Sequence, residues 1–451
     1  MKLANISTVY FLGVGGIGMS ALARYFKLHG CAVSGYDKTK TPLTSTLEKE
    51  GIAIHYSPDS KLIPSSTDLV VYTPAVSATN PEWEAIQKMD VATMKRAEVL
   101  GLISNSGNCL AVAGTHGKTT TSAILSHIFK THFAEVNAFV GGILSNYQTN
   151  FLYSENTNNF VVEADEFDRS FLHLEPNFAV INSVDADHLD IYGKADALID
   201  SFQEFAKKIR PGGALIKNVN IQESFKVQDV KLYTFGIDCE ADFSASNVNV
   251  INGQYHFNYH HSSGTGQKMV LSLPGVHNVE NAVAASAIAT LCGISDEEIA
   301  KAIHSFSGVK RRFEITRNQN GLTYVDDYAH HPTEIAKVLE SAREMYAGKK
   351  LSVIFQPHLY SRTRDFEGDF AKELSKFDEV LLLDIYPARE LPIEGVTSER
   401  LLSKITNKNK TIIEKSAVIE YIKNNQIEVL FTLGAGDIDT LVEPIKALVT
   451  A

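Results

Sequence analysis

The chain has 451 residues, of which 44% are hydrophobic and 21% charged, which is the composition of a globular protein. A chain of this length is too long for a single hydrophobic core. Its formal net charge of -11 argues against a general affinity for nucleic acid or anionic membranes, which need clustered Lys and Arg. The four cysteines form no CxxC pair, no segment has membrane-spanning length and no signal peptide is recognisable, so we expect a cytoplasmic protein without membrane insertion.

The first predicted unit is a strand, a glycine turn and a helix. An apolar run at Thr8–Leu12 precedes the turn GVGGIG, and a helix-period segment follows at Met19–Leu28. The turn satisfies GxGxxG, and Asp37 lies at the distance expected for a carboxylate that meets a ribose hydroxyl. This pattern indicates a diphosphate or mononucleotide at a helix N-terminus. It does not separate NAD from a UDP-linked molecule, or either from a tightly packed turn.

The second predicted unit carries a phosphate-binding loop. A strand that ends at Ala113 leads into GTHGKTT and a helix that runs to about Lys130. The two glycines let the backbone wrap a phosphate, Lys118 adds a positive charge, and Thr119 offers a magnesium ligand. The full pattern GxxxxGK[ST] has glycine where this chain has Val112, so the loop is a shortened variant. The alternative is a glycine-rich turn with a chance lysine.

Two further predicted strands end in acidic residues. FVVEADEFD places Glu163 first among four carboxylates, and FAVINSVDADHLDIYG supplies Asp185, Asp187, His188 and Asp190. Because the carboxyl ends of parallel strands meet at one sheet edge, both clusters are expected beside the loop, where they offer ligands for two metal ions. The alternatives are a solvated acidic loop and a structural histidine.

Amide and arginine side chains close the middle segment. After a β-like stretch at 231–273, GVHNVENAVAA begins a helix on which Asn278 and Asn281 share one face. Their amides suit an adenine edge, although Asn278 is equally suited to cap the helix. In VKRRFE, Arg311 and Arg312 either reach a transferring phosphoryl group or are solvated at the surface.

The last third is predicted to be a small α/β domain. TYVDD, near Leu322, precedes HHPTE and a helix from about Pro332. Further strands are predicted at Leu351–Phe355, Val380–Leu383 and Val429–Leu433. We therefore expect an α/β protein with three domains, at residues 1–104, 105–313 and 314–451.

The segments GVGGIGMSA, KRAEVLG, GTHGKTTT, VEADEFD, DADHLD, HNVENA, VKRRFE, DDYAHHPTE and QPHLYSRTRDF together resemble the Mur ligases, in the same order from Gly13 to Asp437. The resemblance implies a Rossmann-like N-terminal domain for a UDP-sugar, a central P-loop ATPase domain with a mainly parallel sheet, and a Rossmann-like C-terminal domain for an amino acid. Relatives that act later carry a carbamylated lysine where this chain has Ser201 and Phe202. That difference favours the branch that joins L-alanine to UDP-N-acetylmuramate with ATP, through an acyl phosphate, in peptidoglycan precursor synthesis.

The resemblance also implies roles for individual residues. The expected ATP-binding residues are Gly114, Thr115, His116, Gly117, Lys118, Thr119, Thr120, Asn278, Asn281 and Arg312. The expected ligands of two Mg²⁺ ions, or of Mn²⁺, are Thr119, Glu163 and His188, and the expected catalytic residues are Lys118, Glu163, His188, Arg312 and Asp327. The UDP-sugar set is Gly15, Gly16, Ile17, Gly18, Asp37, Ser77 and Arg96, and the amino-acid set is Tyr328, His330, His358 and Arg362. Leu359 stands where some relatives carry arginine, so the clamp on the amino-acid carboxylate is expected to be weaker or built differently.

Other interpretations stay open at this stage. A ligase that attaches a whole tripeptide to the same UDP-sugar, or a folylpolyglutamate synthetase, has a similar loop. A nucleotide-sensing protein keeps the fold without the chemistry, and an NAD-dependent dehydrogenase explains GVGGIG but leaves GTHGKTT without a purpose. PHLYSRT favours a small amino-acid carboxylate. We expect a monomer or a homodimer.

Overall fold

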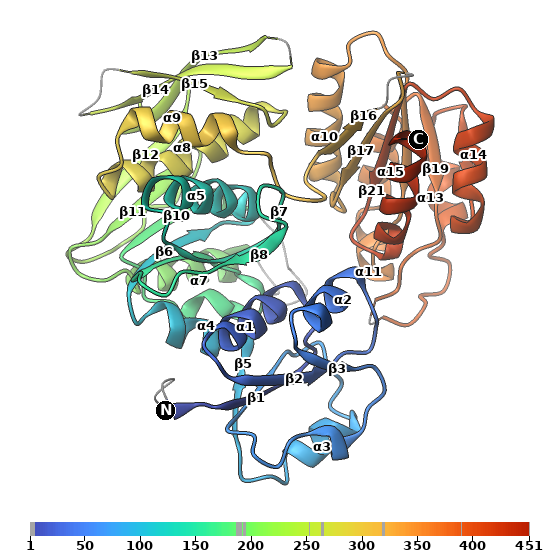
Figure 1. Ribbon diagram of the computed structural model, residues 1–451. Coiled ribbons are helices and arrows are strands. Elements are labelled where there is room, and N and C mark those ends of the chain that lie inside the picture. Colours follow the sequence, from blue (N-terminus) through green and yellow to red (C-terminus); the bar gives the residue numbers. More distant parts are fainter. Residues whose placement is uncertain are drawn as a thin grey trace. The chain divides into compact units, whose positions relative to one another are not determined.

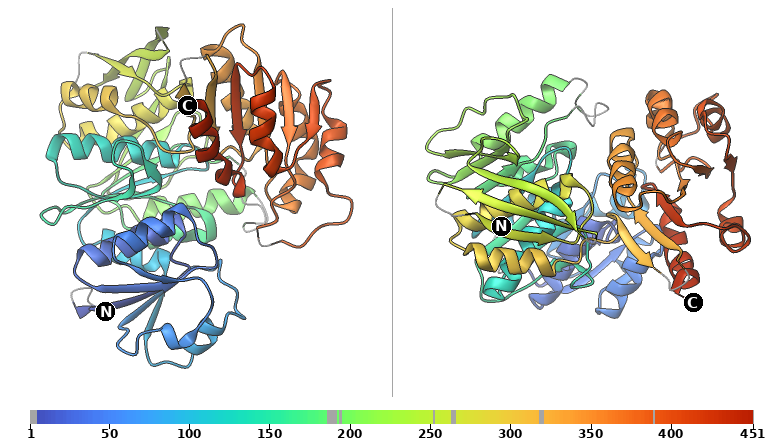
Figure 2. Two further views of the ribbon diagram at one scale, coloured as in Figure 1. Left: turned by 45° about the vertical axis from the view of Figure 1, so that its right-hand side comes forward. Right: turned by 90° about the horizontal axis from the view of Figure 1, so that it is seen from above.

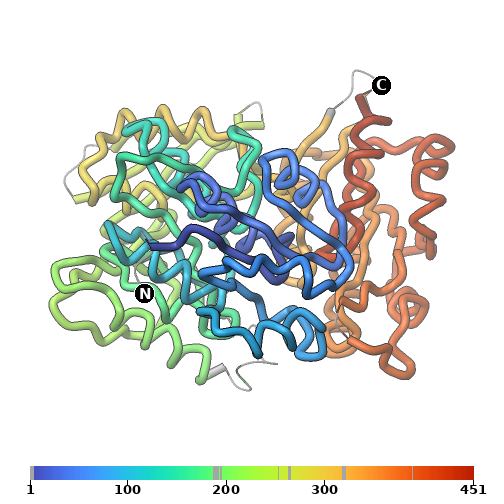
Figure 3. Tube along the Cα trace, turned by 60° about the horizontal axis from the view of Figure 1, so that its bottom comes forward, coloured from blue at the N-terminus to red at the C-terminus, as the bar shows by residue number. Residues whose placement is uncertain are grey.

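Three β-sheets organise the part of the chain that the structure describes, and each is completed before the next begins in sequence (Figure 1). The structure is a computed structural model that describes residues 5–185, 192, 195–251, 253–262, 266–317, 321–388 and 390–450. Two compact units are present: Met1–Asn249, His256–Val270 and Val279–Ser307 form the first, and Val250–Tyr255, Leu271–Asn278 and Gly308–Ala451 form the second. The trace in Figure 3 follows the chain through the sheets from blue to red.

The first sheet has five parallel strands in the order β3-β2-β1-β4-β5. Its elements are β1 (Thr8–Leu12), α1 (Ile17–Leu28), β2 (Ala32–Tyr36), α2 (Pro42–Lys49), β3 (Ala53–His55), η2 (Ser60–Leu62), β4 (Leu69–Tyr72), α3 (Pro81–Ile86), β5 (Ala92–Lys95) and α4 (Arg96–Ser104). Core residues cover both of its faces, as expected for a parallel sheet. Because the strand order reverses between β1 and β4, their carboxyl ends open the crevice in which such sheets bind ligands. The predicted Rossmann-like domain is confirmed.

The second sheet has ten strands in the order β15-β14-β13-β12-β11-β10-β6-β9-β7-β8. Its strands are β6 (Asn108–Ala113), β7 (Asn137–Leu144), β8 (Thr149–Leu152), β9 (Asn159–Glu163), β10 (Phe178–Ile181), β11 (Ala214–Asn218), β12 (Lys231–Ile237), β13 (Phe243–Ile251), β14 (Gln254–His261) and β15 (Gln267–Leu271). Its helices are α5 (Lys118–Phe133), η3 (Phe167–His173), α7 (Ala195–Lys207), α8 (Val276–Leu291) and α9 (Asp296–Ser305). The strands from β7 and β9 across β6 to β13 pair in parallel, so the carboxyl ends of β9, β6 and β10 lie at one edge.

The third sheet has six strands in the order β16-β17-β21-β18-β19-β20, of which only the β16–β17 pair is antiparallel. Its strands are β16 (Glu314–Arg317), β17 (Thr323–Asp327), β18 (Leu351–Phe355), β19 (Glu379–Leu382), β20 (Lys410–Ile412) and β21 (Val429–Leu433). Its helices are α10 (Pro332–Met345), α11 (Tyr360–Asp365), α12 (Glu367–Leu374), α13 (Ser398–Lys404), η4 (Lys415–Ala417), α14 (Val418–Asn424), η5 (Asp437–Leu441) and α15 (Val442–Thr450). Two hydrophobic clusters cover its two faces.

The predicted elements agree closely with the observed ones. The strands predicted at Thr8–Leu12, Leu351–Phe355 and Val429–Leu433 are observed with the same bounds. The first helix begins two residues before its predicted start, at Ile17, and α5 continues past its predicted end to Phe133. The domain boundaries stay predictions, and the hairpin signal at position 252 lies outside the described residues. Among the described helices, none is long and apolar enough to cross a membrane.

One hydrophobic core joins the first sheet to the second within the first unit. Helix α1 packs against the hairpin of β7 and β8 (Figure 2, left). At that contact the buried Asn150 donates to the carbonyl of Ile17 at 2.5 Å and to Ser20 Oγ at 3.0 Å. Arg24 Nε donates to Glu50 Oε2 at 2.7 Å, and Arg24 also donates to the Asn150 amide oxygen. These contacts fix the glycine turn of the first sheet relative to the second sheet.

A buried histidine predicts a pH-dependent stability. His127 on α5 is hydrogen-bonded to Tyr147 Oη at 2.7 Å and to Ser305 Oγ at 2.9 Å, and burial lowers its pKa to about 4. The unfolded chain, with an ordinary histidine pKa, therefore binds more protons between pH 6.5 and pH 4, so the free energy of unfolding falls as the pH drops through this window. Between pH 7 and pH 5 the loss due to His127 is expected to be about 2 kcal/mol.

Urea unfolding of the full chain at pH 7 and pH 5 measures this loss. His127→Gln keeps the capacity for hydrogen bonds but does not titrate, so its stability is expected to fall less over the same interval. An equal fall in the wild type and in the variant would contradict the prediction.

Candidate functional site

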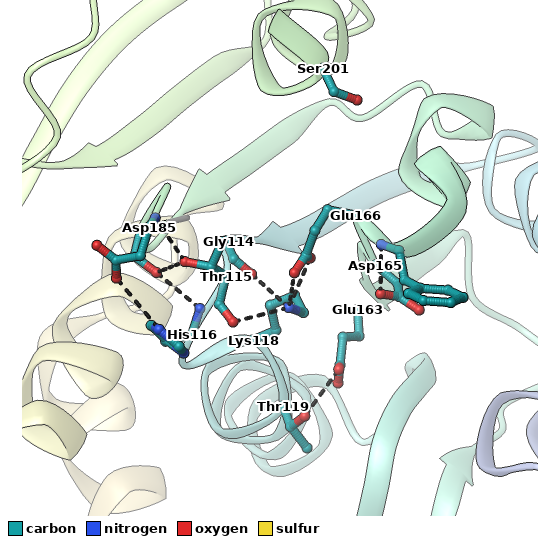
Figure 4. A network of polar contacts seen from close by, with 12 residues as sticks. Gly114, Thr115, His116, Lys118, Thr119, Glu163, Asp165, Glu166, Asp185 and Ser201 are labelled. Atoms are coloured by element: carbon teal, nitrogen blue, oxygen red, sulfur yellow. Dashed lines mark hydrogen bonds and ion pairs between the residues drawn. The ribbon is translucent and has the colours of Figure 1, made fainter. Parts of the chain in front are cut away.

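The strongest candidate site is the loop between β6 and α5, at the shared edge of β9, β6 and β10 (Figure 4). Gly114 and Gly117 have φ angles of +130° and +78°, which side chains rarely adopt. A Cβ atom on Gly114 would lie 2.9 Å from the backbone nitrogens of Asn182 and Ser183, so the loop packs flush against the end of β10. The backbone of Thr115 donates to the Ser183 carbonyl at 3.0 Å, which ties the two segments together. The backbone conformation therefore requires glycine at both positions, 114 and 117.

Lys118 is held over this loop. Its Nζ donates to the carbonyl of Gly114 at 2.7 Å and to Glu166 Oε1 at 2.8 Å, and Glu166 is fully buried. Burial lowers the pKa of Lys118, but the charges of Glu166 and Asp165 outweigh this effect and leave the pKa above its ordinary value. A charged lysine at the N-terminus of a helix, where the first N–H groups have no partner within the helix, is suited to bind phosphates.

Thr119 and Glu163 form an oxygen-rich pair next to Lys118 (Figure 4). Thr119 Oγ1 donates to Glu163 Oε1 at 3.0 Å, and the backbone of Gly141 donates to Glu163 Oε2 at 2.8 Å. Hydroxyl and carboxylate oxygens are the hard ligands that Mg²⁺ prefers, so this pair fits a magnesium ion. Among the described residues, no group of three or more His, Cys, Asp or Glu side chains is arranged so that it could hold a metal ion by itself. His188, predicted as a further ligand, lies outside the described residues.

The second acidic cluster also reaches the loop. The backbone of Asp185 donates to Thr115 Oγ1 at 3.0 Å, and Asp185 Oδ2 lies 3.5 Å from His116 Nε2. Glu163, the last residue of β9, and Asp185, which follows β10, thus lie on either side of the loop that follows β6. The sequence predicted this meeting from the strand ends alone. Thr120 is buried in the first turn of α5.

The two asparagines of α8 make different contacts. Asn281 Oδ1 accepts a hydrogen bond from Thr121 Oγ1 at 3.2 Å, and it abuts Gly117. Asn278, in the second unit, lies inside α8 and donates from Nδ2 to the Pro274 carbonyl at 2.6 Å. The alternative in which Asn278 precedes and caps the helix is therefore wrong, because the helix begins at Val276.

The glycine turn of the first sheet is closed by Asp37. Its Oδ2 accepts a hydrogen bond from the backbone of Gly15 at 2.7 Å. Gly16 is the N-cap of α1, which begins at Ile17. A Cβ atom on Gly18 would lie 2.8 Å from Arg96 Nη1, so Gly18 makes room for that guanidinium.

Two other residues of the predicted UDP-sugar set differ in their surroundings. Arg96 Nη2 donates to Asp165 Oδ2 at 3.3 Å and thereby connects the first sheet to the acidic cluster. Arg96, Glu163 and Asp165 line one small pocket. Ser77 is hydrogen-bonded locally, at 2.8 Å to Thr79 Oγ1. The structure thus brings Arg96, but not Ser77, to the acidic cluster.

Within the second unit, Asp327 organises the residues around Arg312. Its two carboxylate oxygens accept hydrogen bonds from the backbones of Phe313 and Ala329, both at 2.7 Å. Burial raises the pKa of Asp327 to about 6, although the charge of Arg312 opposes this shift. The Arg312 guanidinium lies over the Tyr328 ring, 5.3 Å from its centre.

The four residues predicted to bind an amino acid lie together in this unit. The ring centres of Tyr328 and His330 are 5.2 Å apart, and those of His330 and His358 are 6.0 Å apart. Arg362 Nη1 lies 3.2 Å from His358 Nδ1. Burial lowers the pKa of His330, with Glu334 opposing, so this imidazole favours its neutral form. Leu359, at a φ of +70°, donates from its backbone to the Tyr386 carbonyl at 2.9 Å just before α11.

The sequence did not reveal two residues of these clusters. Glu166 was one of four carboxylates after β9, and only the fold shows that it is the buried partner of Lys118. Arg311 is not solvated at the surface, because its Nε donates to the buried Asp326 at 3.0 Å and its Nη2 to the Gly434 carbonyl at 2.8 Å. The available signal for Arg311 was its positive charge immediately before Arg312, together with the acidic pair Asp326 and Asp327 in TYVDD.

Ser201 and Phe202, which the sequence places in the region of a modified lysine, are both buried on α7, and Figure 4 shows Ser201. Tyr192 Oη lies 3.5 Å from Ser201 Oγ and donates to the Glu166 carbonyl at 2.6 Å. Ser201 is therefore connected to Glu166, the partner of Lys118, through the neutral hydroxyl of Tyr192.

Comparisons with known proteins cover nearly the whole chain. Models described as "Mur ligase family, catalytic domain", "Mur ligase middle domain" and "Mur ligase, glutamate ligase domain" match residues 8–107, 112–289 and 311–437. A UDP-N-acetylmuramate–L-alanine ligase of Flavobacterium psychrophilum is 50% identical over 452 residues, 99% of each chain. One of Porphyromonas gingivalis is 50% identical over 446 residues, 97% of this chain and 98% of the relative. The crystal structure of a UDP-N-acetylmuramate-alanine ligase from Thermotoga maritima matches with a TM-score of 0.84 and 28% identity, covering 98% and 99% of the two chains.

Proposed function

This chain belongs to the Mur ligase family, and we propose that it joins L-alanine to the lactoyl carboxylate of UDP-N-acetylmuramate at the expense of ATP, in peptidoglycan precursor synthesis. The observation that carries the proposal is the charged loop lysine, Lys118, beside the oxygen pair of Thr119 and Glu163. The chain that contains this site is 50% identical over 452 residues to a UDP-N-acetylmuramate–L-alanine ligase. ADP and phosphate are the other products. We place the protein in the cytoplasm, as a monomer or a homodimer.

We assign the ATP phosphates to the loop 114–117 and the first turn of α5. Lys118 neutralises phosphate charge, and the N–H groups at the start of α5 bind phosphate oxygens. Thr119 and Glu163 would hold a divalent cation, Mg²⁺ or Mn²⁺, which would supply further positive charge to the phosphates and the leaving group. We propose a second ion held by Glu163 and His188, and adenine contacts for Asn278 and Asn281.

The chemistry follows from the electrophile that the reaction needs. A lactoyl carboxylate oxygen attacks the γ-phosphorus, and the bond to the bridging oxygen of ADP breaks, which gives an acyl phosphate. The alanine amine then attacks the carbonyl carbon, loses a proton, and the carbon–oxygen bond to phosphate breaks to leave an amide. Arg312 and Asp327 are assigned to the phosphoryl-transfer step. Keeping water from the acyl phosphate requires a closed site.

The UDP-sugar is assigned to the crevice of the first sheet. Asp37 holds the turn at Gly15 so that the N-terminus of α1 faces a diphosphate. Arg96 lies between this turn and the acidic cluster, so we assign it to the end of the sugar that carries the lactoyl carboxylate. Ser77 is a further proposed contact.

Alanine is assigned to the cluster of Tyr328, His330, His358 and Arg362. Arg362→Ala is expected to raise the KM for alanine by about 10- to 100-fold, because a charge-assisted pair with a carboxylate contributes about 1.5–3 kcal/mol. The KM for ATP should stay near the wild-type value. Initial-rate kinetics with each substrate varied in turn measure the effect.

Arg364, on the same helix, is the matched control. Its Nε donates to the exposed Asp365 at 2.8 Å, so Arg364→Ala removes an equal charge away from the cluster. A rise only in the KM for ATP, or an equal rise in both variants, would contradict the assignment of Arg362.

An ADP-release assay with ATP and UDP-N-acetylmuramate, across a panel of amino acids and one free tripeptide, tests the proposed function. ADP release that depends on both the UDP-sugar and alanine is expected. Release that depends on the tripeptide instead would identify the peptide-recycling ligase. Release that depends on neither would remove the assignment.

A further inference from the structure

A chain of three buried polar side chains lies behind the phosphate loop in the first unit. Asn182 Nδ2 donates to Thr121 Oγ1 at 3.0 Å, and Thr121 Oγ1 donates to Asn281 Oδ1 at 3.2 Å. The three residues come from the end of β10, from α5 and from α8, and each is at most 9% exposed. A single hydroxyl thus joins three elements that are distant in the sequence.

The side chains of Asn182 and Asn281 pack closely against one residue of the loop, Gly117. A Cβ atom on Gly117 would lie 2.4 Å from Asn281 Oδ1 and 2.8 Å from Asn182 Nδ2. The backbone of Thr121 also donates to the Gly117 carbonyl at 2.9 Å. Gly117, at a φ of +78°, is therefore held from several sides at the point where the loop turns into Lys118 and Thr119.

The stability of the fold does not account for an asparagine at position 182. Its Oδ1 atom is buried and has no hydrogen-bond partner within the described residues. An unsatisfied buried oxygen costs about 1–3 kcal/mol, which offsets the gain of about 1 kcal/mol from the bond to Thr121. A buried polar group that adds little to stability therefore needs another explanation, and the contact with Gly117 supplies one.

We propose that Asn182 and Thr121 are positioning residues for nucleotide binding, which hold Gly117 so that Lys118 and Thr119 meet the ATP phosphates in one geometry. This inference rests on the proposed function. Since Asn281 is the third member of the chain, the same hydroxyl also fixes the amide assigned to adenine. The contact with adenine and the contacts with the phosphates then both depend on the Thr121 hydroxyl.

Thr121→Val tests the proposal, because valine keeps the shape of threonine and removes the hydroxyl. We expect the KM for ATP to rise about 10-fold and kcat to fall about 10-fold, since small displacements of a positioned group have effects of this size or larger. The KM values for UDP-N-acetylmuramate and alanine should not change. Thr121→Ser keeps the hydroxyl and is expected to restore most of the activity. Asn182→Ala should reproduce the kinetic loss with little change in the melting temperature.

Ser126→Ala is the matched control. Ser126 is a fully buried hydroxyl on the same helix, and its hydrogen bond goes to the backbone carbonyl of Ser122 at 2.6 Å. Wild-type kinetics are expected. Equal losses in Thr121→Val and Ser126→Ala would overturn the proposal, because they indicate a purely structural hydroxyl. No difference between Thr121→Val and Thr121→Ser would also overturn it, because the hydroxyl would then not be required.

Calorimetric titration of the full chain with Mg·ADP separates this proposal from the proposed function. Thr121→Val is expected to bind Mg·ADP about 10-fold more weakly than the wild type and Ser126→Ala. Weaker binding without alanine-dependent turnover in the wild type would support the positioning role and remove the ligase assignment. Equal binding by all three proteins would overturn the positioning role whatever the reaction is.

Discussion

Lys118→Ala is expected to lower alanine-dependent ADP formation by at least about 10³-fold, because it removes the loop lysine that neutralises charge on the transferring phosphoryl group. Lys118 Nζ lies 2.8 Å from the buried Glu166, and its pKa is raised, so it is charged throughout the working pH range. The assay is coupled ADP release at saturating UDP-N-acetylmuramate and alanine. Retained turnover would remove Lys118 from the proposed site.

The same substitution affects stability, and a second variant separates the two effects. Alanine at position 118 leaves Glu166 buried without its cation, and breaking a buried pair in this way costs about 3–5 kcal/mol. The double variant Lys118→Ala/Glu166→Gln removes the orphaned charge, so it is expected to regain stability but not turnover. Recovery of turnover together with stability would show that the single variant fails because it unfolds.

Glu163→Gln is expected to lower turnover by at least about 10²-fold and to raise the Mg²⁺ concentration that gives half-maximal activity. Glutamine replaces one carboxylate oxygen by an amide nitrogen, which neither binds a cation nor accepts the hydrogen bond from Gly141. Activity measured against Mg²⁺ concentration gives both quantities.

Asp168→Asn is the control for this variant. Asp168 belongs to the same acidic segment, but its carboxylate pairs with Lys95 at 3.2 Å and is 41% exposed. Its φ of +52° is one that asparagine tolerates. Near wild-type activity is expected for Asp168→Asn. An unchanged Mg²⁺ dependence in Glu163→Gln would contradict a metal-binding role for Glu163.

The sheets and the site edge were predictable from the sequence because their physical signals are local. Apolar runs such as Leu351–Phe355 are buried on both faces of a parallel sheet and have the same bounds in sequence and structure. Parallel pairing also brings the ends of neighbouring strands together. The meeting of Glu163, the loop and Asp185 followed from that rule without any knowledge of side-chain contacts.

The choice among equivalent side chains was not predictable. The segment after β9 carries several carboxylates and turns sharply at Asp168 and Arg169, which both have positive φ angles, and only the fold shows that Glu166 is the carboxylate that faces Lys118. Arg311 and Arg312 are adjacent in sequence, but the φ of +60° at Arg311 sends its side chain to Asp326. Such turns depend on packing between distant segments, which a local pattern does not encode.

The cluster of Tyr328, His330, His358 and Arg362 also had features that the sequence predicted and features that it did not. The sequence placed His358 and Arg362 in one candidate set, but their contact at 3.2 Å was not predictable, because His358 lies before α11 and is separated from it by the non-helical Leu359. Leu359 was expected to alter the carboxylate clamp because of its side chain. The structure adds that its backbone, with φ at +70°, bonds to Tyr386 and sets the start of α11.

Transfer of the heavy oxygen isotope tests the central claim, an acyl phosphate formed from the sugar carboxylate, most directly. UDP-N-acetylmuramate labelled in both lactoyl carboxylate oxygens is incubated with ATP, Mg²⁺, alanine and the protein, and the released phosphate is analysed by mass spectrometry. Because the bridging oxygen of an acyl phosphate leaves with phosphorus, each ligated alanine is expected to give one inorganic phosphate that carries one heavy oxygen. Unlabelled phosphate, or label found in AMP, would contradict the account.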